Sequence, residues 1–224
     1  MKPKHVAISL ERDITAWAQK NQKTVRESYE LRAAIVSQLI RQQVNSNLPI
    51  LTLFLVSSRQ GIVYLDEEID TLQELFEEVV RDDFIIKNQI KVSVLGKWYN
   101  LPGRVVDIIK CAIDQTKEYD KFFLNLCIMY DGQDEILDAT KLIARRIASN
   151  KLDPDAITKA MIKEDIYTSY FLPPDLVIIN GRKKLNGFLL WDSSNSLVYF
   201  TNKHWPDFKI SDLIKAIDLY SLID

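Results

Sequence analysis

The chain has 224 residues, of which 47% are hydrophobic and 27% are charged. That length fits one large domain or two small ones, and the apolar fraction is ample for a buried core. The formal net charge is -2, which gives no general attraction to nucleic acid or anionic lipid, so we predict no nucleic-acid partner.

Cysteine usage and the N-terminal residues bear on the compartment. Cys111 and Cys127 are the only cysteines, and both lie in apolar runs, which does not suit a disulfide framework or a zinc site. The first residues lead into a short apolar run and lack the long one of a secretory signal. No stretch is long and uncharged enough to span a bilayer. We therefore expect a cytoplasmic protein, with peripheral attachment to a membrane surface as an alternative.

The first half of the chain alternates between apolar strands and amphipathic helices. A strand at 5–10 precedes a helix at 24–45, in which apolar residues recur at near-helical spacing: Val25, Leu31, Ile35, Leu39 and Ile40. The apolar run 49–58 predicts a strand buried on both faces, and the acidic segment 66–81 predicts a helix. A strand at 90–95 and a helix at 102–117, with Pro102 in its first turn, follow.

The second half continues the alternation. A strand at 122–130 leads into a helix at 134–148, and a short helix opens near Asp155. Strands at 176–179 and 197–200 precede a helix at 211–220, with Ser211 as its N-cap. Strands that alternate with helices indicate a parallel sheet covered on both faces. We see no repeat or flexible linker, so we predict a single α/β domain over residues 1–224, with a mostly parallel six-stranded sheet flanked by helices.

Four short segments near the C-terminus carry a family resemblance. They are Pro174-Asp175-Leu176-Val177-Ile178, Phe188-Leu189-Leu190-Trp191, Tyr199-Phe200 and Trp205-Pro206-Asp207-Phe208. Together they resemble the signature region of the cis-prenyltransferases, the undecaprenyl diphosphate synthase family. Weaker blocks in the same order extend the resemblance over nearly the whole chain, among them His5-Val6-Ala7-Ile8, Leu51-Thr52-Leu53-Phe54 and the run from Tyr130 to Ile136.

The resemblance implies both a chemistry and an assembly. Enzymes of this family extend an allylic diphosphate with isopentenyl diphosphate, and hold the diphosphates with arginines, a magnesium-binding aspartate and backbone amides. For this chain the resemblance implies the family's fold, a homodimer or heterodimer, a prenyl diphosphate or isoprenoid ligand, and Mg²⁺ if the protein is active. It also implies that five aromatic residues lie at the subunit interface, with the core as the alternative: Phe188, Trp191, Tyr199, Trp205 and Phe208.

The first phosphate loop departs from the family pattern. Where the family has Met-Asp-Gly-Asn-Gly-Arg-Trp, residues 10–17 of this chain read Leu-Glu-Arg-Asp-Ile-Thr-Ala-Trp, without either glycine. Glu11 takes the place of the aspartate and Asp13 is nearby, so these two are the candidate catalytic residues and Glu11 is the candidate metal ligand. We expect the branched Ile14 and Thr15 to obstruct an amide cradle for a diphosphate.

Most of the family's other diphosphate ligands are replaced as well. The polar residues that could still bind a diphosphate are Arg26, Ser57, Ser58, Arg59, Arg182 and Lys184. Each lost arginine contact costs on the order of 1.5–3 kcal/mol of binding free energy, so we do not expect ordinary chain elongation. The printed sequence reaches Asp224 without the family's Arg-x-Gly tail, and we expect any help to a partner to take another route.

Two further segments favour one explanation of these losses. Gln60-Gly61-Ile62 and Gly187-Phe188-Leu189 resemble the non-catalytic, Nogo-B receptor type subunits of dehydrodolichyl diphosphate synthase. The first hypothesis is therefore a non-catalytic accessory subunit of a heteromeric cis-prenyltransferase. The second is a diverged prenyltransferase or terpene cyclase that acts on a prenyl diphosphate through a rearranged site. The third is an isoprenoid-binding protein without chemistry.

Overall fold

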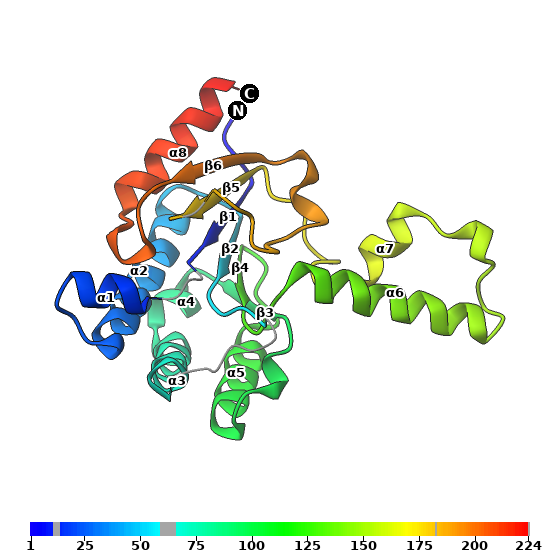
Figure 1. Ribbon diagram of the computed structural model, residues 1–224, viewed down its shortest axis with the longest axis horizontal. Helices are drawn as coiled ribbons and strands as arrows, with labels where there is room; N and C mark the ends of the chain where they lie inside the picture. The colour runs from blue at the N-terminus through cyan, green and yellow to red at the C-terminus, as the bar shows by residue number, and fades with distance from the viewer. Residues whose placement is uncertain (11–13, 59–65, 182, 224) are drawn as a thin grey trace.

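Six parallel strands form the centre of the structure, a computed structural model that describes residues 1–10, 14–58, 66–181 and 183–223 (Figure 1). The strands are β1 (His5–Ser9), β2 (Ile50–Phe54), β3 (Ile90–Leu95), β4 (Phe122–Cys127), β5 (Leu176–Asn180) and β6 (Leu197–Thr201). They lie side by side in the order β3-β4-β2-β1-β5-β6, and every neighbouring pair is parallel. The predicted α/β class and the six-stranded parallel sheet are therefore confirmed.

Helices connect the strands. The α-helices are α1 (Thr15–Lys20), α2 (Val25–Asn45), α3 (Asp66–Arg81), α4 (Asp83–Lys87), α5 (Gly103–Thr116), α6 (Gly132–Ala148), α7 (Lys159–Asp165) and α8 (Ile210–Ile223). Short 3₁₀ helices are η1 (Trp98–Asn100), η2 (Pro154–Ala156), η3 (Asp192–Asn195) and η4 (Trp205–Asp207). No helix in this described part of the chain is both long and apolar enough to cross a membrane.

Capping residues fix where the two long helices α2 and α6 begin. The Thr24 hydroxyl accepts a hydrogen bond from the Glu27 amide, and the Glu27 carboxylate accepts one from the Thr24 amide at 2.7 Å. This reciprocal pair satisfies two of the amide groups that a helix leaves open at its start. These hydrogen bonds to the charged form lower the pKa of Glu27 to about 2. Asp131 caps α6 by accepting from the Gln133 amide.

Several predicted boundaries were wrong. Strand β2 ends at Phe54 and β4 at Cys127, because the apolar residues that follow each strand stay buried but leave the regular ladder. Ser211 is not an N-cap, since α8 already begins at Ile210. Pro102 precedes the first helical residue of α5 rather than lying in its first turn. The sequence pattern also missed α4.

The two faces of the sheet have different coverings. Side chains such as Ile8, Leu53 and Ile178 point to the face covered by α2, α3, α5 and α8, and they belong to the larger apolar core. On the opposite face Phe54 stacks on Phe188, with ring centres 5.1 Å apart, within a smaller apolar cluster. This second covering is made by the loop after β5 and the residues after α7, not by long helices parallel to the strands.

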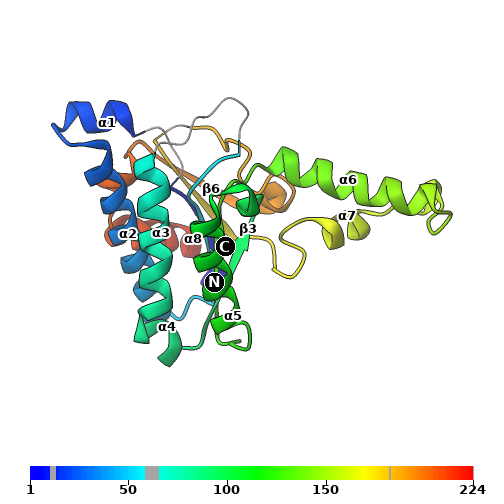
Figure 2. The same cartoon turned by 90° about the horizontal axis from the view of Figure 1, so that it is seen from below.

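Helices α6 and α7 project from one end of the sheet as an arm, which both views show clearly (Figures 1 and 2). Polar contacts anchor the arm to the rest of the chain. Lys163 on α7 forms an ion pair with the buried carboxylate of Asp192 at 2.7 Å, and its ammonium also donates to the carbonyl of Thr168. The arm is therefore held at its base, while its far end lies away from the sheet.

Candidate functional site

The strand order creates one point where a ligand site is expected. From β1 the chain passes to β2 on one side, and from the adjacent β5 it passes to β6 on the other side. In open parallel sheets, ligands bind outside the carboxyl ends of the strands at such a reversal. The loop after β1 carries Glu11 and Asp13, and the loop after β5 carries Arg182 and Lys184. The carboxyl ends of β1 and β5, which these two loops follow in the sequence, thus lie at the same edge of the sheet.

Ser57 and Ser58 follow β2 at this carboxyl edge. Ser57 pairs with Tyr130 in an isolated parallel bridge and is buried. The Ser58 hydroxyl donates to the carboxylate of Asp134 at 2.8 Å, and the same carboxylate lies 3.3 Å from the ammonium of Lys97. The predicted serine pair therefore lies at the carboxyl edge of the sheet, where an acidic side chain of α6 accepts from Ser58.

Lys97 is a cation at this edge, and its ammonium forms ion pairs with two carboxylates. Its ammonium contacts Asp134 and, at 3.5 Å, Asp138. Partial burial disfavours the charged ammonium, but hydrogen bonds and attraction from the two carboxylates outweigh burial and raise the pKa of Lys97. Asp138 also accepts from the Tyr167 hydroxyl at 2.6 Å. This cluster links the ends of β2 and β3 to α6 and to the segment after α7.

Glu135, which follows Asp134 on α6, is buried. Its carboxyl group is the hydrogen-bond partner of the Tyr130 hydroxyl at 2.5 Å, and the residue is 1% exposed. Desolvation is the largest influence and raises the pKa of Glu135 to about 7, although the hydrogen bond from Tyr130 acts in the other direction. The burial of Glu135 shows that it is part of the core beneath the candidate site.

Two glycines let the loop after β5 approach the start of α6. The Gly132 amide donates to the Gly187 carbonyl at 2.8 Å, and a Cβ atom on Gly132 would lie 2.4 Å from that oxygen. Gly187 itself has a φ of +79°, which favours glycine. The segment Gly187-Phe188-Leu189 therefore has a structural reason for its glycine, which is the close contact between these two loops.

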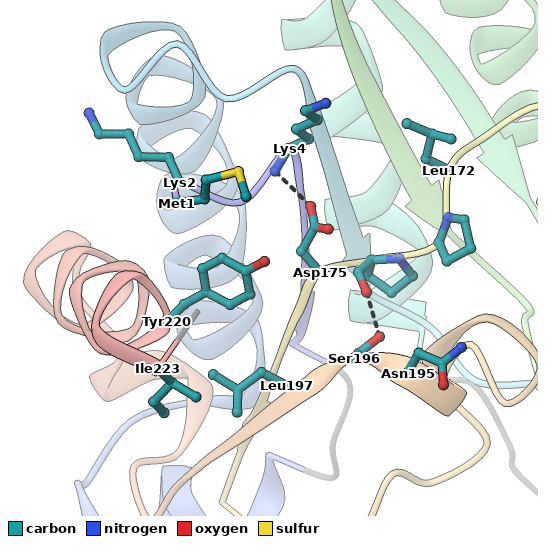
Figure 3. A pocket seen from close by; sticks show the side chains of 12 residues that line it. Met1, Lys2, Lys4, Leu172, Asp175, Asn195, Ser196, Leu197, Tyr220 and Ile223 are labelled. Carbon is teal, nitrogen blue, oxygen red and sulfur yellow. Dashed lines mark hydrogen bonds between the residues drawn. The ribbon is translucent and has the colours of Figure 1, made fainter.

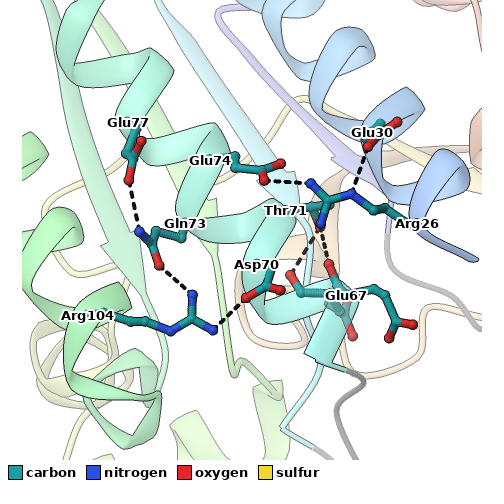
Figure 4. Close-up of polar contacts among 10 residues, drawn as sticks. Arg26, Glu30, Glu67, Asp70, Thr71, Gln73, Glu74, Glu77 and Arg104 are labelled. Atoms are coloured by element: carbon teal, nitrogen blue, oxygen red, sulfur yellow. Dashed lines mark hydrogen bonds and ion pairs between the residues drawn. The ribbon is translucent and has the colours of Figure 1, made fainter.

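Arg26, near the start of α2, is engaged by acidic residues on two helices (Figure 4). Its guanidinium contacts Glu30 at 3.0 Å and Glu74 of α3 at 2.7 Å. Arg104 of α5 binds the other flank of α3 through Asp70 and Gln73. Both arginine side chains are about half exposed and join helices to one another. The geometry thus shows Arg26 as a link between α2 and α3.

Arg32, two turns further along α2, was not among the predicted site residues. It is 3% exposed, and its Nη1 donates to the Leu55 carbonyl at 2.8 Å and to the Glu68 carboxylate at 3.0 Å. Its guanidinium carbon lies 4.7 Å from the ring centre of Tyr29 and 5.8 Å from that of Trp205. A sequence signal existed, because residues 29, 32, 36 and 39 fall on one helical face and the others there are Tyr, Val and Leu.

Two buried polar side chains near the carboxyl edge lack partners among the described residues. The Trp205 indole nitrogen has no hydrogen-bond acceptor although the side chain is 1% exposed. Asn180, the last residue of β5, has neither its amide nitrogen nor its amide oxygen satisfied. Buried polar groups in native proteins are normally paired, so each of these groups calls for an explanation such as a ligand.

The remaining predicted site residues have varied positions. Glu11, Asp13, Arg59 and Arg182 lie outside the described residues, as does Gln60-Gly61-Ile62. Lys184 lies on the exposed surface of the loop after β5. Their roles therefore stay predictions.

The aromatic residues predicted at a subunit interface separate into two groups. Phe188, Trp205 and Phe208 are at most 2% exposed within this single chain, so their side chains pack in its own core. Apolar contacts inside the chain enclose these three side chains, as the core alternative expects, and a role at a subunit interface stays a prediction. Trp191 and Tyr199 are only partly buried and keep some surface that a partner could cover.

The family resemblance implied Mg²⁺, and the described donor set does not fit that ion. Among the described residues, no group of three or more histidine, cysteine, aspartate or glutamate side chains is arranged to hold a metal. The two carboxylates at the edge, Asp134 and Asp138, both lie against Lys97, which takes the place a cation would need. The candidate ligand Glu11 lies outside the described residues.

A surface pocket of about 840 Å³ lies at the opposite edge of the sheet (Figure 3). It is lined by residues around the starts of β1, β5 and β6 and by α8, including Lys4, Asp175, Leu197 and Tyr220. The Asp175 carboxylate accepts from the backbone amides of Lys4 and His5, which joins the first residues to the start of β5. None of the predicted site residues lines this pocket.

Comparison with known proteins identifies the family. A family model described as "Putative undecaprenyl diphosphate synthase" matches residues 15–223. The chain belongs to this family, the cis-prenyltransferases. A curated relative from Methanocaldococcus jannaschii, named tritrans,polycis-undecaprenyl-diphosphate synthase (geranylgeranyl-diphosphate specific), is 35% identical over 97% of this chain and 80% of its own. An isoprenyl transferase of Prochlorococcus marinus is 31% identical over 96% of this chain and 79% of its own.

Solved structures agree with the cis-prenyltransferase assignment. Lavandulyl diphosphate synthase from Lavandula x intermedia, in complex with dimethylallyl diphosphate, superposes with a TM-score of 0.88. It shares 28% sequence identity with this chain and covers 98% of this chain and 95% of that one. A probable undecaprenyl diphosphate synthase from Campylobacter jejuni has the same fold, with a TM-score of 0.75. These relatives are similar to the chain across almost its entire length.

Proposed function

We propose that this protein is a cis-prenyltransferase-like subunit that does not itself elongate prenyl chains and instead pairs with an active family member. The observation that supports the proposal is that carboxylates of the chain already bind two of the candidate diphosphate ligands, Arg26 and Ser58. Arg26 is bound by Glu30 and Glu74, and Ser58 donates to Asp134. Carboxylates of the chain thus hold side chains that would otherwise bind phosphate oxygens.

Electrostatics strengthens this reasoning. A diphosphate is desolvated when it enters a site, and charge-assisted hydrogen bonds have to offset that cost. Asp134 and Asp138 lie at the carboxyl edge beside Lys97, so the cation is neutralised before any phosphate arrives. The loop at 10–17 also lacks the glycines of the family pattern. The proposed role retains the family's fold and pairing surfaces without its usual diphosphate site.

Assembly and a gain of activity test the proposal together. The purified chain is mixed with a cis-prenyltransferase of the same organism that retains an intact Asp-Gly-Asn-Gly-Arg loop, and the mass of the complex is measured by light scattering. We expect a heterodimer with greater chain-elongation activity than the active enzyme alone. Trp191→Ala should weaken the heterodimer, whereas Lys183→Ala, an exposed control from the same part of the chain, should not. Two separate species without any gain in activity would contradict the proposal.

A second candidate function is a diverged enzyme that acts on short allylic diphosphates. The observation that favours it is the likeness to lavandulyl diphosphate synthase, whose structure holds dimethylallyl diphosphate, over 98% of this chain. In this reading Arg59, Arg182 and Lys184 would contribute to a rearranged diphosphate site, with Mg²⁺ bound through Glu11. Product formation from dimethylallyl diphosphate by the purified chain would favour this candidate over the first.

A further inference from the structure

The buried guanidinium of Arg32 is the strongest unexplained charge in the described structure. Its side chain is 4% exposed and that of its ion-pair partner Glu68 is 13% exposed, whereas the pair that Arg26 makes with Glu74 is about half exposed on both sides. Burying a charge is costly unless hydrogen bonds satisfy it. Both hydrogen bonds that the Arg32 guanidinium makes to described residues leave from Nη1. The other guanidinium nitrogens therefore retain donor capacity, and they are not fully enclosed although the side chain as a whole is buried.

Trp205 provides a second, independent observation at the same place. Its ring centre lies 5.8 Å from the Arg32 guanidinium carbon, and its indole nitrogen is buried without an acceptor among the described residues. An indole N–H can only donate, so only an acceptor atom can satisfy it. A buried cation and a buried unsatisfied donor thus lie near each other. Any oxygen acceptor could satisfy the two donors, and an anionic oxygen would also balance the charge of the guanidinium.

The position of this pair relates it to the carboxyl edge. Arg32 reaches the carbonyl of Leu55, the first residue after β2, and Glu68 lies in the first turn of α3. Glu68 is the more exposed member of the ion pair. The Glu68 carboxylate already pairs with Nη1 of the guanidinium. If the Glu68 side chain moved toward solvent, this nitrogen could donate to another anion.

We propose that Arg32 and the indole N–H of Trp205 form an anion subsite for a phosphate or diphosphate group, and that Glu68 occupies it when no ligand is bound. The planar guanidinium can donate two parallel hydrogen bonds to phosphate oxygens, while the indole adds a third donor. Tyr29 packs against the guanidinium and holds its plane. The subsite does not depend on the proposed accessory function, since binding needs neither catalysis nor a partner.

Isothermal titration with inorganic diphosphate tests the proposal. Glu68→Gln removes the competing charge, and we expect it to bind diphosphate about tenfold more tightly than the unmodified chain. In the Glu68→Gln background, Arg32→Gln and Trp205→Phe should each weaken binding by about tenfold or more. Arg32→Lys keeps the charge but loses the two parallel donors of the guanidinium, so it should give an intermediate affinity. This variant replaces Arg32→Gln in the test if Arg32→Gln fails to fold.

The matched control is Arg41→Gln. Arg41 lies on the same helix, pairs with Asp82 at 3.0 Å and packs on the Phe84 ring at 4.7 Å, but its side chain is 47% exposed. Its removal should leave diphosphate affinity unchanged. No measurable binding by Glu68→Gln, or equal losses in the Arg32 and Arg41 variants, would overturn the subsite. Acetate binding as tight as diphosphate binding would also overturn it, because the site would then be a general carboxylate site.

Discussion

Two regions of the molecule hold their polar groups in different ways. At the ends of β2, β3 and β4, Ser58, Lys97 and Tyr130 each have a carboxylate of α6 as partner. On α2, Arg32 has partners for one of its nitrogens, and the nearby indole nitrogen of Trp205 in η4 has none among the described residues. The comparison teaches that two of the predicted diphosphate ligands, Arg26 and Ser58, are already engaged by carboxylates of the chain, whereas unused donor capacity lies where the sequence pattern gave no expectation of a site.

The largest effect that we expect comes from Arg32. Arg32→Ala leaves Glu68 and the Leu55 carbonyl without their partner, and breaking a buried pair on one side costs about 3 kcal/mol. Arg41→Ala removes an exposed pair and should cost about 1 kcal/mol or less. Urea unfolding of both variants measures the difference. Equal losses would show that the region between α2 and α3 is no more dependent on its buried charge than an ordinary surface.

The second prediction concerns how the free energy of unfolding depends on pH through two buried groups, Glu135 and His5. Burial raises the pKa of Glu135 from 4.5 to about 7, so its contribution to stability is complete below pH 4.5 and is lost as the pH rises to 7. Burial lowers the pKa of His5 from 6.5 to about 4, so its contribution is complete above pH 6.5 and is lost as the pH falls to 4. At 1.36 kcal/mol per pKa unit, each effect amounts to roughly 3 kcal/mol.

Because the two effects oppose each other, single variants should reveal them. Glu135→Gln leaves the His5 effect, so the free energy of unfolding should rise with pH between about 4 and 6.5. His5→Gln leaves the Glu135 effect, so the free energy of unfolding should fall between about 4.5 and 7. Urea midpoints measured across this range check both slopes. The same slope in the two variants would mean that one of these groups titrates normally.

The third prediction is smaller and concerns Ser58. Ser58→Ala removes the hydrogen bond that the hydroxyl donates to the Asp134 carboxylate at a partly buried position. The free energy of unfolding should therefore fall by about 1 kcal/mol. Diphosphate affinity should not fall, since this hydroxyl is engaged with Asp134. Thermal unfolding and diphosphate titration of the variant give the two values. A clear loss of diphosphate affinity would return Ser58 to the list of ligand contacts.

The smallest effect should come from Arg26. Its ion pairs with Glu30 and Glu74 are exposed, and exposed pairs contribute about 0.2–1 kcal/mol each. Arg26→Ala should therefore change the urea midpoint little and leave diphosphate binding as it was. High salt should weaken the contribution further. A tenfold loss of diphosphate affinity in this variant would contradict the distinction between Arg26 and Arg32 on which the comparison rests.

Much of the fold followed from the sequence. The acidic amphipathic segment 66–81 is α3 and the run 90–95 is β3, because period and composition agree there. The ends of β2 and β4 were missed, because Leu55 and Ile128 stay buried after the ladder has ended and burial alone does not mark a strand boundary. Leu31 was predicted on the apolar face of its helix, yet it is 37% exposed while Arg32 beside it is buried.

The candidate site followed from the sequence only in part. The sheet topology places the carboxyl ends of β1 and β5 at one edge. The order of the sequence motifs had already indicated the two loops that follow these strands. The partners of Arg26 and Ser58 could not be predicted, because Glu74 and Asp134 are distant in sequence and meet these side chains only through helix packing. Trp205 and Phe208 were expected at an interface or in the core, and both are buried within the chain, where η4 packs onto α2.

The most direct test of the proposed function is incorporation of radiolabelled isopentenyl diphosphate by the purified chain, with farnesyl or geranyl diphosphate and Mg²⁺. The same assay is repeated with an active cis-prenyltransferase of the same organism. The account predicts no incorporation by the chain alone and more incorporation by the mixture than by the active enzyme alone. Incorporation by the chain alone would contradict it and would direct mutagenesis to Arg59, Arg182 and Lys184.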